Sequence, residues 1–397
     1  MRVGFLFNHD QIHQVAHSLP IAMALANSGF AGDIVAATTS ERLAREVCSL
    51  GAPLVGSRIE HVALGLKRSS ARLARLLGAL APAGKLLVYR DNLDFFRSLD
   101  LLVVAEKTSL VLRTAHGLKR PLLVHTRHGA GDRAIGFDRH SALFDHVLCS
   151  GTKIRERLMR EAGLPAGSIS VVGYPKFDIA RPSVRPKSLL PQRPMVLYNP
   201  HPAPHLSSWY RHGRAVLDFF VDNDDYQLIF APHVMLFERR FVVTIDRPRI
   251  CRPGRLAQRY LRCPNIHVDL GSRASTDMSY TLGADIYLGD ASSQVYEFLY
   301  RPRPCLFLNS HRLDWRGDPN FEHWNAGPVI AHPAQLAAGL RQAVQTHGAE
   351  YLQVQQQMRA RSFDVTEQPA SQRAAEALLG FMERRGLSAR ARGSLAA

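Results

Sequence analysis

Short apolar segments alternate with longer amphipathic ones along most of the chain. Continuous apolar runs bounded by glycine, proline and polar residues are typical of strands buried on both faces of a parallel sheet. The strands predicted in the first half are Val3–Phe7, Asp33–Ala37, Lys85–Tyr89, Leu101–Ala105, Leu122–His125, Asp145–Ser150 and Ile169–Val172. The helices predicted between them are His13–Ser28, Glu41–Leu50, Thr108–His116 and Thr152–Gly163, and the segment Val62–Leu80 is basic and amphipathic. This alternation predicts a parallel sheet covered by helices on both faces.

The pattern is interrupted once, between Arg181 and Pro194, by the proline-rich and basic sequence RPSVRPKSLLPQRP. We interpret this segment as a linker, because it has no hydrophobic periodicity. A second alternation then begins. Its predicted strands are Met195–Tyr198, Gln227–Ala231, Ile266–Asp269, Asp285–Leu288, Cys305–Leu308 and Val329–Ala331. Its predicted helices are Ser208–Val221, Thr276–Leu282, Ser292–Tyr300, Pro333–Thr346 and Ser371–Arg384.

The predicted fold class is therefore α/β, with two Rossmann-like doubly wound domains facing across a cleft. The predicted division is an N-terminal Rossmann-like domain over 1–180, a linker over 181–194, a C-terminal domain over 195–365, a helix over 366–386 and a disordered basic tail over 387–397. Doubly wound domains bind ligands at the carboxyl ends of their strands. Binding residues are thus expected in loops that directly follow strands.

Charge and cysteine content narrow the possible partners. The chain has 50 basic and 34 acidic residues, a net charge of +16, which indicates an anionic partner. No nucleic-acid-binding module accompanies this charge, so we expect no nucleic acid, whereas an anionic membrane surface or polymer fits the basic clusters. Five scattered cysteines without metal spacing indicate a reducing compartment. With no signal peptide and no apolar run of about 20 residues, we expect a cytoplasmic protein that is at most peripheral on the membrane.

The stretch from Leu282 to Asn309 reads as strand, tight turn, helix and strand. Asp290 ends the first strand, and Ser292 and Ser293 are predicted to cap the helix that follows. Backbone N–H groups, hydroxyls and a helix N-terminus would then converge at a spot that suits a phosphate or diphosphate. The alternative is an ordinary strand-to-helix turn with a serine cap.

A second candidate is the glycine-containing loop after the strand at Leu122–His125. His128 can accept a proton near neutral pH, and Gly129 lets a substrate approach the backbone. Arg127 and Arg133 are candidates for holding phosphate. The alternative is a loop with surface histidines.

Three further candidates also follow strands. His233 follows Pro232 and is expected to face the first domain, where one histidine would act as base and the other would neutralise a departing phosphate; alternatively it merely ends a strand. Pro200 belongs to a rigid, proline-rich segment expected to line a nucleotide site. Lys176 is a candidate for contacting phosphate, and Asp178 for capping a helix.

Taken in order, these motifs resemble the CDP-glycerol glycerophosphotransferase family of teichoic-acid and capsule polymerases. The matching segments are His128-Gly129, Gly173–Asp178, Tyr198–Pro200, Pro232-His233, Ala284-Asp285, Asp290–Ser293 and Glu297. The chain departs from the family pattern at Gly289 and Ala291, which stand where the family usually has threonine and tyrosine.

The resemblance implies a GT-B architecture and a CDP-activated alcohol bound mainly by the second domain. It implies that His128 and His233 are the two essential histidines. It also maps Ser292 and Ser293 onto the diphosphate-binding hydroxyls. Combined with the candidates above, the predicted donor- and phosphate-binding set is Arg127, Gly129, Lys176, Pro200, Asp290, Ser292, Ser293 and Glu297. No metal and no cofactor besides the nucleotide-activated co-substrate is expected.

The leading hypothesis is a transferase that moves an alditol phosphate from a CDP-activated donor to a hydroxyl of a cell-surface polymer or its lipid-linked precursor. The alternative is a GT-B glycosyltransferase that uses a nucleotide-sugar donor. An enzyme similar to UDP-GlcNAc 2-epimerase is a third possibility.

Overall fold

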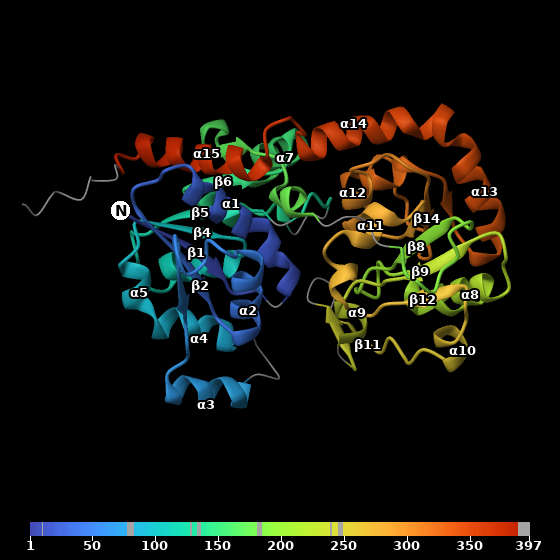
Figure 1. Cartoon of the computed structure of the whole chain (residues 1–397), viewed down its shortest axis with the longest axis horizontal. Coiled ribbons are helices and arrows are strands. Elements are labelled where there is room, and N and C mark those ends of the chain that lie inside the picture. Colours follow the sequence, from blue (N-terminus) through green and yellow to red (C-terminus); the bar gives the residue numbers. More distant parts are fainter. Residues whose placement is uncertain are drawn as a thin grey trace, which may run out of the picture. The chain divides into compact units, whose positions relative to one another are not determined.

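The chain forms two compact units. A computed structural model describes residues 1–9, 11–77, 83–127, 129–132, 136–180, 185–238, 240–244 and 249–387. Unit 1 consists of Met1–Ala130, Ile135–Ile179 and Arg361–Ala397, and unit 2 of Gly131–Ala134 and Ala180–Ala360. Each unit is built on its own parallel sheet (Figure 1).

Unit 1 contains a seven-stranded parallel sheet in the order β3-β2-β1-β4-β5-β6-β7. Its strands are β1 (Arg2–Phe7), β2 (Asp33–Thr38), β3 (Ile59–Ala63), β4 (Leu101–Val104), β5 (Leu122–Thr126), β6 (His146–Cys149) and β7 (Ile169–Val171). Strand β1 is third in this order, with Val3 opposite Ile34 of β2 on one side and Leu101 of β4 on the other. The chain therefore reverses its direction of winding between β1 and β4.

Helices cover both faces of this sheet. The helices of unit 1 are α1 (Val15–Asn27), α2 (Glu41–Leu50), α3 (Arg68–Leu77), α4 (Ala83–Asp91), α5 (Leu93–Arg97), α6 (Val111–Thr114), α7 (Thr152–Ala162) and α15 (Ala370–Arg384). Apolar residues of α1, α2 and α15 form one core with the sheet, and those of α4, α5 and α7 form the other. Helix α2 begins where predicted, because the Ser40 hydroxyl accepts a hydrogen bond from the Leu43 N–H at 3.3 Å.

Unit 2 contains a six-stranded parallel sheet in the order β12-β9-β8-β13-β14-β15. Its strands are β8 (Met195–Asn199), β9 (Gln227–Phe230), β12 (Ile266–Val268), β13 (Ile286–Gly289), β14 (Cys305–Leu308) and β15 (Val329–Ile330), and a separate hairpin pairs β10 (Val242–Thr244) with β11 (Arg249–Cys251). Counted from its own first strand, unit 2 repeats the strand order of unit 1, so β8 corresponds to β1 and β13 to β4.

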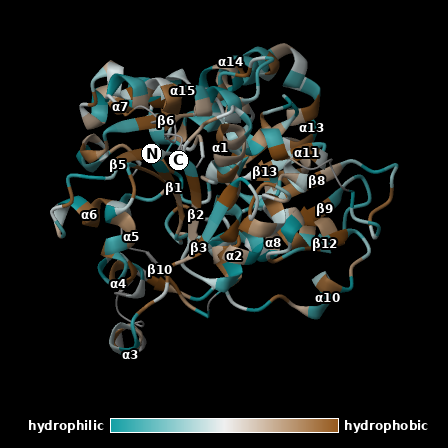
Figure 2. Cartoon of the chain, turned by 60° about the vertical axis from the view of Figure 1, so that its left-hand side comes forward, coloured by the Kyte–Doolittle hydropathy of each residue, from teal (hydrophilic) through white to brown (hydrophobic). Residues whose placement is uncertain are grey.

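The helices of unit 2 are α8 (Trp209–Val221), α9 (Met235–Glu238), α10 (Gln258–Leu261), α11 (Ser279–Gly283), α12 (Gln294–Phe298) and α13 (Leu336–Thr346). Helices α8 and α13 pack their apolar residues against one face of the sheet. Figure 2 shows apolar residues concentrated on the strands of both units. Helix α14 (Leu352–Phe363) begins in unit 2, and its last residues belong to unit 1.

Two elements of unit 1 differ from the predictions. The apolar run Lys85–Tyr89 lies in helix α4 and is not a strand, because its burial follows a helical face: Val88 and Tyr89 are buried, whereas Leu86 is 41% exposed. The segment from Val62 to Leu80, predicted as amphipathic, begins with the end of strand β3 and contains helix α3; residues 78–80 lie outside the described part of the chain.

Each unit is made of more than one segment of the chain, so the chain passes between the units more than once. Helix α15 belongs to unit 1, and so do residues 361–365, which the sequence places in the C-terminal domain. The segment Gly131–Ala134, which follows β5 of unit 1, belongs to unit 2. Residues 181–184 of the expected linker and 388–397 of the expected tail lie outside the described residues. None of the described helices has the length and apolarity needed to cross a bilayer.

Candidate functional site

Polar groups gather in unit 2 at the carboxyl ends of β8 and β13. These strands are neighbours, and Asn199 at the end of β8 pairs with Gly289 at the end of β13. The chain winds away from them in opposite directions, so this position is the switch point of the sheet. Ligands of doubly wound domains bind in the crevice at such a point.

Asp290 is the centre of this group. Its carboxylate is buried and accepts hydrogen bonds from the His201 N–H at 2.9 Å, the Ser208 N–H at 2.6 Å and the Ser208 hydroxyl at 2.8 Å. Burial raises the pKa of Asp290 to about 6, although the hydrogen bonds oppose that shift. Asp290 thereby fixes the loop after β8 against the end of β13.

Ser292 and Ser293 lie beside it but differ in surroundings. The Ser292 hydroxyl is buried and lies 2.5 Å from Asn199 Oδ1, to which it donates. Asn199 in turn donates to the Ala231 carbonyl at 2.7 Å, which connects the ends of β8 and β9. Ser293 is exposed.

The helix that follows is shorter than predicted. Helix α12 has five residues, and no side-chain cap comes from Ser293; instead, the Gln294 N–H donates to the Ser292 hydroxyl at 3.4 Å. So short a helix has a small dipole. Any anion at this place would depend on hydroxyl and N–H groups more than on the helix.

The glycine at position 289 has a steric reason. A Cβ at Gly289 would lie 2.5 Å from the ring of Tyr287, which is completely buried two residues earlier. A threonine at this position would overlap with that ring. This departure from the family pattern is therefore coupled to the packing of Tyr287.

A buried pair of an aspartate and a histidine, Asp132 and His323, contacts the backbone at Asp290. Asp132 Oδ2 lies 2.8 Å from His323 Nδ1, and both Asp132 carboxylate oxygens lie 2.7 Å from the Tyr296 hydroxyl. His323 Nε2 lies 3.0 Å from the Asp290 carbonyl oxygen, which also accepts from the Trp324 indole at 2.9 Å. Both ring nitrogens of His323 therefore face oxygen atoms, one of Asp132 and one of Asp290.

His233 lies at the edge of the same group. Its N–H donates to the Pro200 carbonyl at 3.2 Å, and its ring centre is 6.3 Å from that of His201. Its Nδ1 accepts a hydrogen bond from the Met235 N–H at 3.3 Å. Of the predicted residues, Pro200, His233, Asp290, Ser292, Ser293 and Glu297 all belong to unit 2, and Glu297 is buried in α12.

The remaining predicted residues belong to the first domain's sequence. His128 and Arg133 lie outside the described residues. The guanidinium of the half-buried Arg127 donates to the Gly136 carbonyl and lies 4.3 Å from the centre of the Phe137 ring, and desolvation lowers its pKa to about 10. These contacts give Arg127 a role in holding the loop after β5.

Gly129 and Lys176 are also in unit 1. Gly129 has φ +90°, which only glycine adopts without strain. Lys176 is buried in the 3-10 helix Pro175–Ile179.

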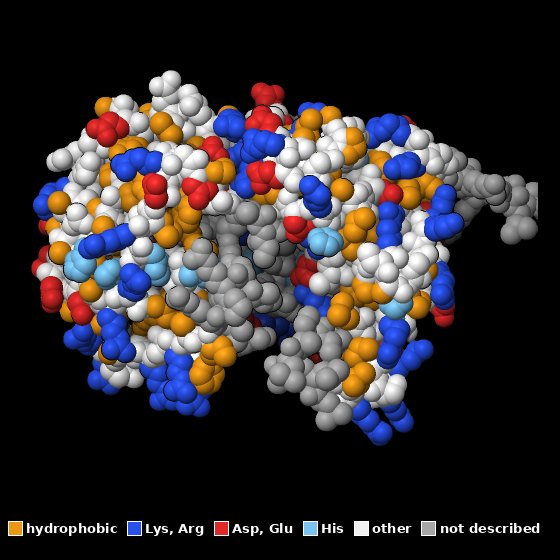
Figure 3. Space-filling model, turned by 180° about the vertical axis from the view of Figure 1, so that it is seen from behind, with side chains coloured by type: hydrophobic (Ala, Val, Ile, Leu, Met, Phe, Trp, Pro, Cys, Tyr) orange, Lys and Arg blue, Asp and Glu red, His pale blue; other side chains and the backbone are white. Residues whose placement is uncertain are grey.

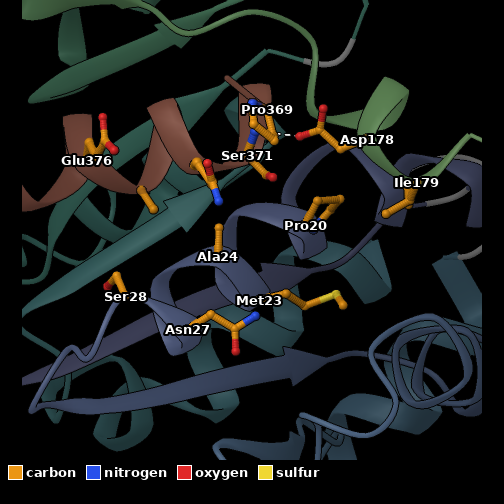
Figure 4. A pocket seen from close by; sticks show the side chains of 12 residues that line it. Pro20, Met23, Ala24, Asn27, Ser28, Asp178, Ile179, Pro369, Ser371 and Glu376 are labelled. Atoms are coloured by element: carbon orange, nitrogen blue, oxygen red, sulfur yellow. Dashed lines mark hydrogen bonds between the residues drawn. The ribbon is translucent and has the colours of Figure 1, made fainter. Parts of the chain in front are cut away.

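The same 3-10 helix borders a separate hollow of unit 1. The cavity, of about 500 Å³, lies between α1 and the start of α15 and is lined by residues such as Met23, Asp178 and Ser371 (Figure 4). Asp178 caps α15 by accepting hydrogen bonds from the N–H groups of Ala370 at 3.3 Å and Ser371 at 2.6 Å. Its contacts make Asp178 a structural residue, as its predicted capping role requires.

Sequence reasoning missed several members of the group in unit 2. Asn199 directly ends a predicted strand, so the rule that placed the other candidates could have found it. Asp132, Tyr296 and His323 carry no comparable signal, because their meeting depends on the fold. His323 lies in the 3-10 segment Pro319–Ala326, which has no regular hydrophobic pattern.

The fold defines a class: two α/β units, each with a parallel sheet, of the kind found in GT-B-like enzymes. No protein-family model matches the chain, and no curated protein matches it in sequence.

Several solved structures share the fold. The wall teichoic acid polymerase TagF is 13% identical, with a TM-score of 0.60 over 97% of this chain and 90% of that chain. UDP-GlcNAc 2-epimerase from Neisseria meningitidis, bound to UDP-GlcNAc, is 10% identical, with a TM-score of 0.60 over 97% of this chain and 100% of that chain. MnaA from S. aureus, in a structure with UDP, is 12% identical, with a TM-score of 0.59 over 98% and 97%. At these identities the similarity shows the fold alone.

Proposed function

We propose that the protein is an enzyme of surface-glycan synthesis that transfers an alditol phosphate from a CDP-activated donor to a hydroxyl of a polymer or lipid-linked acceptor. The observation that carries this proposal is that serine hydroxyls and an asparagine amide gather around Asp290 at the switch point of unit 2. Ser293 is exposed there, and Asn199 and Ser292 hold the neighbouring backbone in place. The resemblance of the motifs from His128-Gly129 to Glu297 to the glycerophosphotransferase family supports the proposal, as does the fold shared with TagF.

In the proposed reaction the acceptor oxygen forms a bond to the distal phosphorus of the donor, and the bond from that phosphorus to the CMP oxygen breaks. His128 takes the proton of the acceptor hydroxyl. CMP leaves with its charge balanced by His233 and the hydroxyl of Ser293. Such phosphoryl transfer needs positioning and charge neutralisation more than covalent participation by the protein.

Two other activities are candidates on this fold. A glycosyltransferase would use a nucleotide-sugar donor. The acceptor would attack a carbon of the sugar, and a nucleoside diphosphate would leave. A 2-epimerase is favoured by the UDP-GlcNAc 2-epimerase from Neisseria meningitidis, which is as similar in fold as TagF is. It would release no free nucleotide as its product.

Product analysis separates the three activities. The protein is incubated with CDP-glycerol, then with UDP-glucose and UDP-GlcNAc, in the presence of a membrane extract as the source of acceptor. CMP release supports the proposal, nucleoside diphosphate release supports the glycosyltransferase, and inversion at C2 of the sugar supports the epimerase. If CDP-glycerol is never consumed while a UDP-sugar is converted, the proposal is refuted.

A variant tests the histidine assigned to the leaving group. We expect His233→Ala to lose at least a hundredfold in turnover, the lower range for a positioned acid–base group, with an unchanged far-UV spectrum. His140→Ala is the matched control, because the side chain of His140 is 74% exposed in unit 1. Near-normal turnover of folded His233→Ala would remove His233 from the mechanism.

The basic charge supports an anionic surface as a partner. On the face shown in Figure 3, Lys and Arg side chains are distributed over both units, with Asp and Glu among them. We expect salt-sensitive binding to vesicles that contain phosphatidylglycerol and none to duplex DNA. Binding to DNA alone would contradict this assignment.

A further inference from the structure

The switch point of unit 1 carries a second polar cluster, between the ends of β1 and β4. Asn8 and His9 follow β1, and Glu106 follows β4, in the same topological position that Asn199 and Asp290 occupy in unit 2. His9 Nδ1 lies 3.5 Å from Glu106 Oε1, and Lys85 Nζ lies 2.5 Å from Glu106 Oε2. Doubly wound sheets bind ligands at this position, so the cluster lies where a ligand of unit 1 is expected.

The cluster continues as a chain of hydrogen bonds. Glu106 Oε2 lies 3.3 Å from the Thr108 hydroxyl, which lies 3.4 Å from the Tyr89 hydroxyl, and Tyr89 accepts from Asn8 Nδ2 at 2.5 Å. Although burial acts to raise it, the neighbouring His9 and Lys85 bring the pKa of Glu106 down to about 2. Glu106 is thus ionised and paired with Lys85 at neutral pH.

Three buried atoms of the cluster have no hydrogen-bond partner among the residues that the structure describes, Asn8 Oδ1, His9 Nδ1 and His9 Nε2. Of these, His9 Nδ1 lies within ion-pair distance of Glu106, at 3.5 Å from Oε1. The two residues are only 4% and 5% exposed. A buried polar atom without a partner is unfavourable, and such atoms in native proteins need an explanation.

The chemistry of the cluster selects its partner. The charges of Glu106 and Lys85 offset each other, so neither an isolated anion nor an isolated cation gains from the site. Apart from His9 Nδ1, which faces Glu106, the unsatisfied atoms are one acceptor, Asn8 Oδ1, and one ring nitrogen, His9 Nε2, that can donate or accept. A neutral hydroxyl, which does both, fits this pair.

We infer that the switch point of unit 1 binds a hydroxyl of a polyol or sugar, through Asn8 and His9, with Glu106 orienting the His9 ring. The side chains of Lys85 and Glu106 keep 13% and 16% of their surface exposed, so the solvent-facing side of the cluster is the side of this ion pair. This inference rests on the proposed function, because the hydroxyl belongs to the acceptor of the transfer. His9 and Asn8 are binding residues, and Glu106 is a positioning residue.

Saturation-transfer NMR on the full chain tests the binding with two probes, sn-glycerol 3-phosphate and propyl phosphate, which differ by the two hydroxyls. We expect the glycerol compound to bind and propyl phosphate not to bind. His9→Gln, His9→Ala and Glu106→Gln should each weaken binding about three- to tenfold, the range for loss of one hydrogen bond to a neutral group. His61→Ala and Glu60→Gln, both on β3, are the matched controls and should bind as the unchanged protein does.

The nucleotide site serves as an independent readout. All three tryptophans, Trp209, Trp315 and Trp324, belong to unit 2, so their fluorescence on heating with CDP or UDP reports donor binding. Equal stabilisation of the His9 variants and the unchanged protein, with weaker glycerol 3-phosphate binding, supports the inference. Equal binding of both probes, no binding of either, or unchanged binding by the folded His9 variants overturns it. Absence of any nucleotide effect refutes the proposed function instead.

Discussion

Removing the Asp132 carboxylate should destabilise unit 2 specifically. Asp132 is 3% exposed and accepts hydrogen bonds from the Tyr296 hydroxyl, the His323 ring and the His323 N–H. Asp132→Ala removes the acceptor of the Tyr296 hydroxyl and of the His323 ring, both of which are buried. At about 1–3 kcal/mol for each buried group whose hydrogen bond is removed, we expect a loss of about 3–5 kcal/mol. Asp132→Asn keeps the size and some hydrogen bonds, so we expect a loss of about 2 kcal/mol, close to one hydrogen bond to a charged group.

Urea unfolding followed by tryptophan fluorescence measures this effect, because every tryptophan of the chain is in unit 2. For an m-value of about 3 kcal/mol/M, the midpoint of Asp132→Ala should fall by about 1–1.5 M. Asp224→Asn is the control, since the Asp224 side chain is 92% exposed. If Asp132→Ala shifts the midpoint no more than Asp224→Asn does, the contact between Asp132 and His323 does not stabilise unit 2.

Three further predictions follow from packing and from titration. Gly289→Thr should lower the free energy of unfolding of unit 2 by about 1–3 kcal/mol, because its side chain overlaps the Tyr287 ring; an unchanged urea midpoint would contradict this. The pKa of Glu106 is lowered to about 2, so its contribution to stability is present above the unfolded-state pKa near 4.5 and is lost as the pH falls toward 2. Allowing for the partial exposure of Glu106, we expect the free energy of unfolding to fall by about 2 kcal/mol from this group between pH 5 and about pH 2. In Glu106→Gln this part of the pH dependence should be absent when unfolding is followed by far-UV circular dichroism at several pH values. Cys48 is exposed and should react rapidly with DTNB in the native protein, whereas burial raises the pKa of the Cys305 thiol, which should react only on unfolding, as mapped by mass spectrometry.

The sequence predicts the sheets better than the surrounding helices. Strands such as β4 and β14 are buried on both faces, so each appears as an uninterrupted apolar run. Strand β3 lies at the edge of its sheet and contains Glu60 and His61 among its apolar residues. It therefore lacks a continuous apolar run and was not predicted as a strand. Helix α4 was mistaken for a strand because a short apolar run has the same appearance in either structure.

The site was predictable where its residues follow strands and not where they come together from distant segments. His233, Asp290 and the two serines could be found by their positions. His9 and Glu106 follow strands as well and could have been found by applying the same rule to β1 and β4. The contact between Asp132 and His323 joins residues 191 positions apart and is set by tertiary packing, to which no local pattern points.

The placement of α15 determines how this protein can be divided in the laboratory. Ala374, Leu378 and Phe381 of this C-terminal helix are part of the core that also contains α1. A fragment ending near residue 180 would therefore expose a hydrophobic surface that α15 covers in the full chain. Such a fragment should aggregate on expression. A version in which 361–387 is fused behind residue 180 through a flexible glycine–serine tether would restore the missing cover and give a soluble single unit for ligand screening.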